Sequence, residues 1–332
     1  MKDRRIGYLL AVIGCALVVV AAAWRFGIGP LFIKLPDDLK SSSTQTGKLT
    51  VFADRATARF YPSGEEAVTQ LVIENKDVGA TALNNRRILV VNERVTLRDK
   101  NTGQVLEGLQ EPTLYVLDRR TCENIPGLIQ GIDRTGYTIK LPMLAEKKAY
   151  PMWDDDLRRT ITADFVKTGR FDGNRAKGVE VYVYRIDGDF EKMAKPPPGV
   201  PESITGKKAK ELTGNPGLPV ADDAEIKIEY FKKTNATIYV EPKTGAVVYS
   251  PSHKYAYYVK NAPGKSPDYV KIAEVEYSTD LPSAKRDIDN GGKYRRLIDL
   301  DLKWAPISFL AWGIALITLG FFLNRKYVRN AS

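Results

Sequence analysis

The sequence predicts a mainly β protein, in which an antiparallel β-rich extracytoplasmic domain is flanked by N- and C-terminal transmembrane helices. Two long apolar stretches without a charge lie near the two ends of the chain. The region between them contains runs rich in β-branched residues, separated by Gly, Pro and Asn. Short polar turns that end in Gly recur between these runs, as in antiparallel hairpins.

The two apolar stretches, residues 6–24 and 304–323, contain no charged side chain. As α-helices, both are long enough to cross a hydrocarbon core of about 30 Å. Basic residues flank the stretches on their terminal sides: Lys2, Arg4, Arg5, Arg325, Lys326 and Arg329. Because such flanks stay in the cytoplasm, we expect cytoplasmic tails at 1–5 and 324–332, and an extracytoplasmic domain at 25–303.

Two features leave this topology open. Arg25 and Lys303 lie at the opposite ends of the spans and oppose the charge count. The first stretch also fits a cleaved signal peptide, since Ala21 and Ala23 offer a cleavage site after a basic start. Its apolar run exceeds the roughly 7 to 15 residues of a signal peptide, which favours a retained anchor.

Composition places the protein at a membrane and argues against nucleic acid. The net charge is +10, of which the N-terminal tail contributes +2 and the C-terminal tail +3, leaving only +5 for the large remainder. Cys15 lies in the first span and Cys122 in the domain, so no disulfide framework is expected. An exported domain of this size without disulfides is typical of a bacterial envelope. We therefore expect a two-pass protein of the bacterial cytoplasmic membrane.

The chain between the spans is expected to begin with an apolar exit segment at 25–39 near the membrane surface, followed by strands. A Pro/Gly-rich loop or insertion is expected at about 195–222, where successive prolines exclude helix and central strand. Residues 283–302 have a helical pattern that Gly291 and Gly292 should interrupt. The predicted strands include residues 49–51, 67–74, 87–91, 162–165, 179–183, 226–230, 237–241, 255–259 and 270–277.

Three polar turns are expected to join neighbouring strands, at 99–103, 118–122 and 241–245. The first and last end in Gly, which adopts positive φ without strain. Thr-Gly pairs at 46–47, 135–136 and 168–169 are interpreted as further turns.

Several of these segments resemble the porin PorA family of bacterial envelope proteins. They are the N-terminal anchor with Arg25-Phe26, Leu35-Pro-Asp-Asp-Leu39, Asp118-Arg-Arg-Thr121, Glu146-Lys-Lys-Ala-Tyr150 running into Met152-Trp-Asp154, Tyr239-Val-Glu-Pro-Lys-Thr-Gly245 and the basic helix before the C-terminal anchor. The resemblance covers nearly the whole chain and implies no catalytic motif. Cys122 stands where the family turn usually has Gly. Since the two spans are helices, whereas a porin needs about eight or more membrane strands, pore formation by a monomer ranks low.

No cofactor, metal or enzymatic function is expected. The single histidine, His253, has no Gly-x-Ser-x-Gly motif beside it and is expected to be solvent-exposed on a turn with Ser250 and Ser252. One histidine and two cysteines cannot supply a typical zinc site. Phosphate-binding loops and basic-aromatic nucleic-acid motifs are absent from the sequence.

Two groups of residues are candidates for ligand contacts. Trp153 beside Asp154-Asp-Asp156 combines an aromatic platform with carboxylates, as in glycan-handling sites, and Tyr150 precedes it. The resemblance implies instead a packing and turn motif for Tyr150, Trp153 and Asp154. The second group, Phe26, Phe32 and Trp304, belongs to apolar segments (26–35 and 297–304) that could form a floor through which an acyl chain enters a β-lined cavity.

The function expected from these features is non-catalytic: the external domain binds or shelters an amphiphilic envelope component, a lipid or lipoglycan. The alternative is a scaffold or accessory subunit of a membrane assembly, in which the small residues Gly7, Gly14 and Ala21 form a helix contact with a protein partner. A glycan-acting enzyme that uses Asp154 or Asp156 ranks behind both.

Overall fold

The computed structural model describes residues 2–37, 39–51, 53–54, 59–60, 67–80, 85–105, 113–172, 178–197, 200–213, 216–260 and 269–331. The chain forms two compact units. The helical unit contains Met1–Lys34 and Asn290–Ser332, and the β unit contains Leu35–Asp289.

The helices run longer than the apolar stretches. α1 (Lys2–Ala23) continues through a π-helical turn, η1 (Trp24–Ile28), into α2 (Gly29–Phe32). α4 (Leu281–Asp299) continues through a second π-helical turn, η2 (Leu300–Trp304), into α5 (Ala305–Ala331). The expected helix at 283–302 is therefore confirmed, but the interruption at Gly291 and Gly292 is wrong, because α4 is continuous there. The helical segments Arg5–Phe32 and Leu281–Arg325 are long and apolar enough to cross a membrane.

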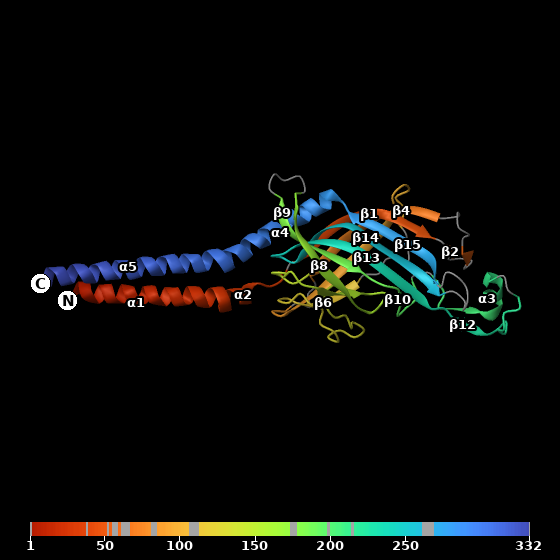
Figure 1. Cartoon of the computed structure of the whole chain (residues 1–332), viewed down its shortest axis with the longest axis horizontal. Helices are drawn as coiled ribbons and strands as arrows, with labels where there is room; N and C mark the ends of the chain where they lie inside the picture. Colours follow the sequence, from red (N-terminus) through yellow and green to blue (C-terminus); the bar gives the residue numbers. More distant parts are fainter. Residues whose placement is uncertain are drawn as a thin grey trace. The chain divides into compact units, whose positions relative to one another are not determined.

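Within the helical unit, α1 and α5 lie side by side and antiparallel, with both chain termini at one end of the pair (Figure 1). Glycines on the two helices face each other. A Cβ atom added to Gly14 would lie 2.6 Å from the carbonyl oxygen of Gly313, and one added to Gly320 would lie 2.5 Å from that of Gly7. The small-residue face expected on the first helix thus exists, and the last helix of the same chain covers it.

The β unit is built from long antiparallel strands (Figure 1). The strands are β1 (Lys40–Val51), β2 (Ala53–Asp54), β3 (Arg59–Phe60), β4 (Ala67–Ala80), β5 (Ile88–Asp99), β6 (Thr113–Asp118), β7 (Tyr150–Asp154), β8 (Arg159–Phe171), β9 (Val179–Asp187), β10 (Glu191–Lys192), β11 (Ser203–Thr205), β12 (Glu225–Lys227), β13 (Tyr230–Glu241), β14 (Ala246–Lys260) and β15 (Tyr269–Thr279). The prediction of a mainly antiparallel β domain with a helix at each end is confirmed.

One eleven-stranded sheet dominates the unit, in the order β6-β5-β4-β1-β15-β14-β13-β9-β8-β7, with β10 paired to β13 beside this path. The strand pairs β11-β12 and β2-β3 form two small separate sheets. In the expected insertion at 195–222 the structure adds a helix, α3 (Gly206–Thr213), that the prolines and glycines of this stretch had not indicated.

All three polar turns form: the turn at 241–245 joins β13 to β14, whereas the turns after Asp99 and Asp118 lead into isolated β-bridges at Val105 and Asn124. In the first, the Asp99 carboxylate accepts hydrogen bonds from the backbone N–H groups of Asn101 and Thr102, and Gly103 has φ +70°. The turn after Asp118 has the same bonds, with Cys122 at φ +64° in place of a glycine. In contrast, the Thr-Gly pairs at 46–47 and 168–169 lie inside β1 and β8, so their interpretation as turns is wrong.

The two edge strands of the sheet, β6 and β7, are both covered by one irregular stretch, residues 119–149, which we call the seam segment. On the β6 side, the N–H of Ile125 donates to the carbonyl of Val116, 2.7 Å away. On the β7 side, the N–H of Tyr137 donates to the carbonyl of Pro151 and the N–H of Trp153 donates to the carbonyl of Tyr137, at 2.9 and 2.7 Å. The seam segment therefore satisfies backbone groups that a bare edge would leave open.

The main core, inside the curved sheet, combines residues of β5 to β9 and β13 with the seam segment. Leu35 and Arg119 fix the chain at this core: Leu35 is fully buried, and the Arg119 guanidinium donates two hydrogen bonds to its carbonyl oxygen. We call the following residues the main core: Leu35, Leu89, Val91, Tyr115, Leu117, Cys122, Tyr137, Leu141, Tyr150, Ala163, Tyr184, Ile186, Ala236, Ile238 and Val240.

The glycine contacts in the helical unit predict a sharp difference between two alanine substitutions. Gly14→Ala should destabilise the helix pair by about 1–3 kcal/mol, because the new methyl group overlaps backbone of the facing helix. Gly27→Ala is the matched control, since an added Cβ there meets nothing within 4 Å. Thermal melting of both variants in mild detergent, followed by circular dichroism, tests this; equal melting temperatures would contradict the packing.

Candidate functional site

The alternation of side chains along three neighbouring strands places a polar and aromatic patch on the inner face of the sheet. His253, Tyr255 and Tyr257 of β14 lie opposite Ala236, Thr234 and Lys232 of β13, respectively. On the other side, the same three residues lie opposite Tyr277, Val275 and Ala273 of β15. Because side chains alternate between faces with a period of two, these nine residues share the face that carries the main core. We call them the inner patch.

Lys232 joins this patch to the end of β7. Its ammonium group donates to both oxygens of Asp154, at 3.0 and 2.8 Å, and to Asp156, at 2.7 Å. Asp154 ends β7, and two strands separate β7 from β13 in the sheet. The turn after β7 reaches Lys232 beside β10, since the N–H of Ala194 donates to the carbonyl of Asp156 and β10 pairs with β13 at Lys232. The Tyr257 hydroxyl also donates to Asp156, at 3.1 Å.

The charges around Lys232 favour the cationic form of its side chain. Lys232 and Asp154 are both buried. Desolvation opposes the charge of the ammonium group, but the carboxylates of Asp156 and Asp154 outweigh it and raise the pKa of Lys232. A buried pair of this kind stabilises the fold little compared with apolar residues, yet losing one partner leaves an uncompensated charge.

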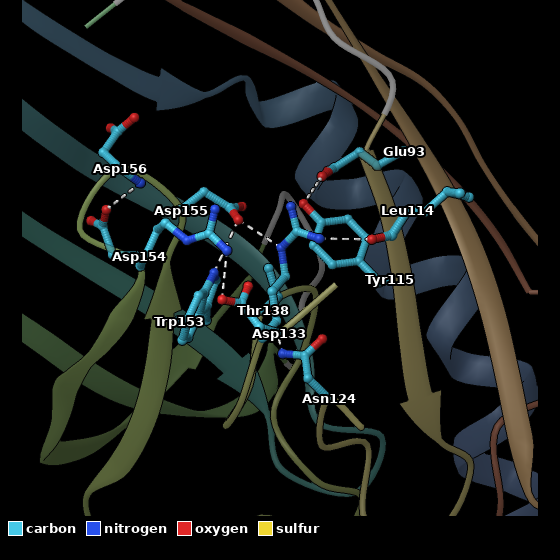
Figure 2. Close-up of polar contacts among 12 residues, drawn as sticks. Glu93, Leu114, Tyr115, Asn124, Asp133, Thr138, Trp153, Asp154, Asp155 and Asp156 are labelled. Carbon is cyan, nitrogen blue, oxygen red and sulfur yellow. Dashed lines mark hydrogen bonds and ion pairs between the residues drawn. The ribbon is translucent and has the colours of Figure 1, made fainter. Parts of the chain in front are cut away.

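The three consecutive aspartates have separate roles. Asp154 also accepts the backbone N–H groups of Asp156 and Leu157, which fixes the turn after β7. Asp155 accepts hydrogen bonds from Arg134 at 2.6 Å and from the Trp153 indole N–H at 3.0 Å (Figure 2). Each carboxylate has a cationic partner, and none is held in the manner of a general base.

A second polar cluster links the seam segment to β5 and β6. Arg134 donates to the carbonyl oxygen of Leu114 and lies over the Tyr115 ring, 4.9 Å from its centroid. The Tyr115 hydroxyl donates to Glu93 at 2.7 Å (Figure 2). Burial raises the pKa of both Glu93 and Tyr115.

Tyr255, Tyr277 and His253 of the inner patch are only half-buried, although burial shifts their pKa values. It raises the pKa of Tyr255 to about 12 and that of Tyr277 well above 10. Among the described residues, no group hydrogen-bonds to either hydroxyl. The side chains are thus surrounded by protein yet keep accessible surface and unused hydrogen-bonding capacity.

Thr234, in the same patch, is buried, and its Oγ1 has no hydrogen-bond partner among the described residues. A buried hydroxyl without a partner costs about 1–3 kcal/mol. This cost would disappear if a bound molecule or water supplied the missing partner.

His253 is not the exposed turn residue that the sequence predicted. It lies within β14, half-buried, with its ring stacked on that of Tyr277 at a centroid distance of 4.6 Å. Desolvation, with a smaller effect of the Lys232 charge, lowers the pKa of His253 to about 4. Ser250 is also buried in this strand, where its hydroxyl donates to the Thr237 carbonyl.

The candidate contact residues divide between the two units. Tyr150, Trp153 and Asp154 lie together on β7. Tyr150 is buried and packs edge-to-face against Tyr137 and Tyr184. Its role is packing, as the resemblance implies, whereas Trp153 and Asp154 belong to the polar contacts described above.

The other three candidates belong to the helical unit and expose large apolar surfaces. Phe26, Phe32 and Trp304 are 82%, 62% and 54% exposed. Phe32 stacks on Trp24 at 5.8 Å.

The main residues that sequence reasoning missed are Lys232, Tyr255, Tyr257, Tyr277 and Arg134. One signal was present: Tyr255 and Tyr257 are two apart in a predicted strand, so they had to share a face. Nothing local indicated that Lys232 would meet Asp154, 78 residues earlier in the chain. Among the described residues, no group of three or more His, Cys, Asp or Glu side chains could hold a metal ion.

Removal of the buried Lys232 ammonium group should lower the free energy of unfolding. Lys232→Met leaves Asp154 and Asp156 without their cation, and we expect a loss of about 3–5 kcal/mol in the free energy of unfolding. The matched control is Lys192→Met, which breaks the exposed ion pair with Glu229 and should cost less than about 1 kcal/mol. Urea unfolding of both variants checks the difference, and similar midpoints would refute the assignment.

The lowered pKa of His253 predicts acid sensitivity. The unfolded chain binds a proton at this site near pH 6.5, while the folded chain resists protonation down to about pH 4. Stability from this group is therefore lost as the pH falls from about 6.5 to 4. His253→Phe keeps the stacking on Tyr277 and removes the titration, so its melting temperature should rise relative to the parent protein as the pH is lowered from 7 to 4.5. A constant difference would contradict this prediction. Burial also raises the pKa of Asp287 to about 7. This group titrates in the same way in both proteins, so its effect cancels in the difference between their melting temperatures.

Comparison with known proteins matches nearly the whole chain to one family. The family model described as Porin PorA matches residues 6–322. The chain is also similar to a protein of Corynebacterium amycolatum named Porin PorA, with 22% identity over an alignment of 397 residues that covers 97% of this chain and 99% of the relative. The match extends from the first apolar helix through the β unit to the last one, and the chain belongs to the porin PorA family.

Proposed function

We propose that the protein is a non-catalytic membrane protein whose β unit binds an amphiphilic component of the cell envelope, a lipid or lipoglycan. The observation that carries this proposal is the environment of the Tyr255 and Tyr277 side chains. Both are desolvated, both retain accessible surface inside the sheet, and both have hydroxyls without a partner among the described residues. Side chains in this state suit a site that a guest molecule completes.

The surroundings of the two tyrosines suit a molecule with a polar head and an apolar chain. Polar capacity comes from their hydroxyls, from Thr234 and from the neutral His253 ring. Apolar surface adjoins them, since Leu49, Ala273 and Val275 form a buried cluster against the tyrosines of the inner patch. Such a mixture of aromatic, apolar and a few polar groups is typical of small-molecule sites.

The packed main core argues against one route of access. The sequence suggested that an acyl chain passes beside residues 26–35 into the domain. Leu35, however, is fully buried and its carbonyl is held by Arg119, so the interior next to it is filled. The inner patch near Lys232, rather than the core around Leu35, is the favoured position for the ligand.

The same filled core argues against a water-filled channel through the β unit, although the relative carries the name of a porin. The engaged carboxylates of Asp154, Asp155 and Asp156 argue against glycan hydrolysis. Topology stays part of the proposal: the tails at 1–5 and 324–332 in the cytoplasm, residues 25–303 outside it, and the stretches 6–24 and 304–323 in the membrane. These two stretches lie within the long apolar helical segments Arg5–Phe32 and Leu281–Arg325.

The test is analysis of bound lipid in the full-length protein, purified in mild detergent and extracted for mass spectrometry. We expect a stoichiometric amphiphile in the parent protein and several-fold less in the double variant Tyr255→Ala/Tyr277→Ala. The matched control is Tyr258→Ala/Tyr269→Ala, which removes two tyrosines of the same strands that pack against Phe190 instead of the inner patch.

Two results would overturn the proposal: no bound amphiphile in the parent protein, or equal loss in both double variants. Recovery of a stoichiometric protein partner without lipid would favour the scaffold alternative. The glycine face of α1 could not serve that partner without displacing α5.

A further inference from the structure

Two charges that the topology does not explain lie in the helical unit. Arg25 and Lys303 stand at the ends of the apolar stretches opposite to the basic tails. They belong to a wider set: residues 24–34 and 290–304 contain six basic and two acidic side chains. The basic residues are Arg25, Lys34, Lys293, Arg295, Arg296 and Lys303.

The structure places Arg25 and Lys303 at the same level of the helix pair. Next to Arg25, the Trp24 indole N–H donates to both the backbone and the carboxylate oxygen of Asp301, at 3.1 and 3.2 Å. Four residues further on, Gly29 packs against Leu302. The π-helical turns η1 and η2, which contain the two basic residues, are thus held side by side.

Each of the two cations lies over an exposed aromatic ring. The Arg25 guanidinium is 5.7 Å from the centroid of Phe26, and the Lys303 ammonium is 5.3 Å from that of Trp304. No ion pair to either cation is present in the described part of the chain. Both charges are therefore available to a ligand.

The exposed surface around them mixes charge with large apolar side chains. Between Lys293 and Trp304 the exposed residues are Lys293, Arg296, Leu297, Leu300, Lys303 and Trp304. Leu297 and Leu300 are 54% and 58% exposed. Interleaved basic and apolar side chains, with aromatic rings, are typical of protein surfaces at the boundary between lipid headgroups and acyl chains.

We propose that Arg25 and Lys303 form a binding site for the phosphate of an anionic glycerophospholipid, with its acyl chains along Phe26, Leu300 and Trp304. The guanidinium can bind two phosphate oxygens and the ammonium can add a point charge. The neighbouring Lys293 and Arg296 raise the local concentration of anionic lipid. This site is separate from the inner patch of the β unit and does not rest on the proposed function.

The experiment uses the full-length protein in a non-ionic detergent, titrated with phosphatidylglycerol or with phosphatidylcholine of the same acyl chains, with bound lipid counted by native mass spectrometry. We expect tighter binding of phosphatidylglycerol. Arg25→Gln/Lys303→Gln should weaken it about tenfold. The matched control is Arg5→Gln/Arg325→Gln, which removes the same charge from exposed positions at the other end of the helix pair. This variant should retain the tightest phosphatidylglycerol binding.

Equal weakening in the two double variants would show attraction by net charge alone and would overturn the proposal. Equal binding of both lipids by the parent protein would do the same. Melting curves of the variants in the same detergent separate loss of binding from loss of fold. Lipid bound to the inner patch should be lost in Tyr255→Ala/Tyr277→Ala and retained in Arg25→Gln/Lys303→Gln, which distinguishes this site from the interior of the β unit.

Discussion

The need to satisfy backbone groups at the two edges of the sheet shapes the β unit. β6 and β7 end the strand order, and each would otherwise present unpaired N–H and C=O groups. The seam segment bonds to both, through Ile125 on one side and Tyr137 on the other. The same segment supplies Cys122, Tyr137 and Leu141 to the main core. The main core therefore depends on this closure.

The closed sheet contains two kinds of interior. Around Leu35 and Tyr184, apolar and aromatic side chains are packed to near-complete burial, which is the source of most of the stability of such a fold. Around Tyr255 and Tyr277, the side chains are desolvated but incompletely packed, and polar atoms stay without partners. Burial of polar groups without hydrogen bonds is unfavourable, so a fold that retains them there has sacrificed stability at the position where we place the ligand.

The sequence could predict features that depend on neighbouring residues, but not contacts that depend on strands far apart in the chain. The turns at Asp99 and Glu241 were predictable, because a carboxylate and a residue at positive φ act within five residues. The position of His253 was not: Pro251 suggested a turn, but it lies at an irregularity of the β13-β14 register, where a missing N–H is tolerated. The Lys232 contact depends on sheet order and curvature, which no single segment encodes. Of the candidate site, the sequence indicated Trp153 and Asp154 but could not supply their partners.

The pairing of the first and last helices has a consequence for biosynthesis. Trp24 and Asp301 are 277 residues apart, and Gly14 meets Gly313 only after nearly the whole chain has left the ribosome. Until then the first helix has no intramolecular cover for its glycine face. Nascent chains stalled before the final helix would therefore carry an uncovered glycine face.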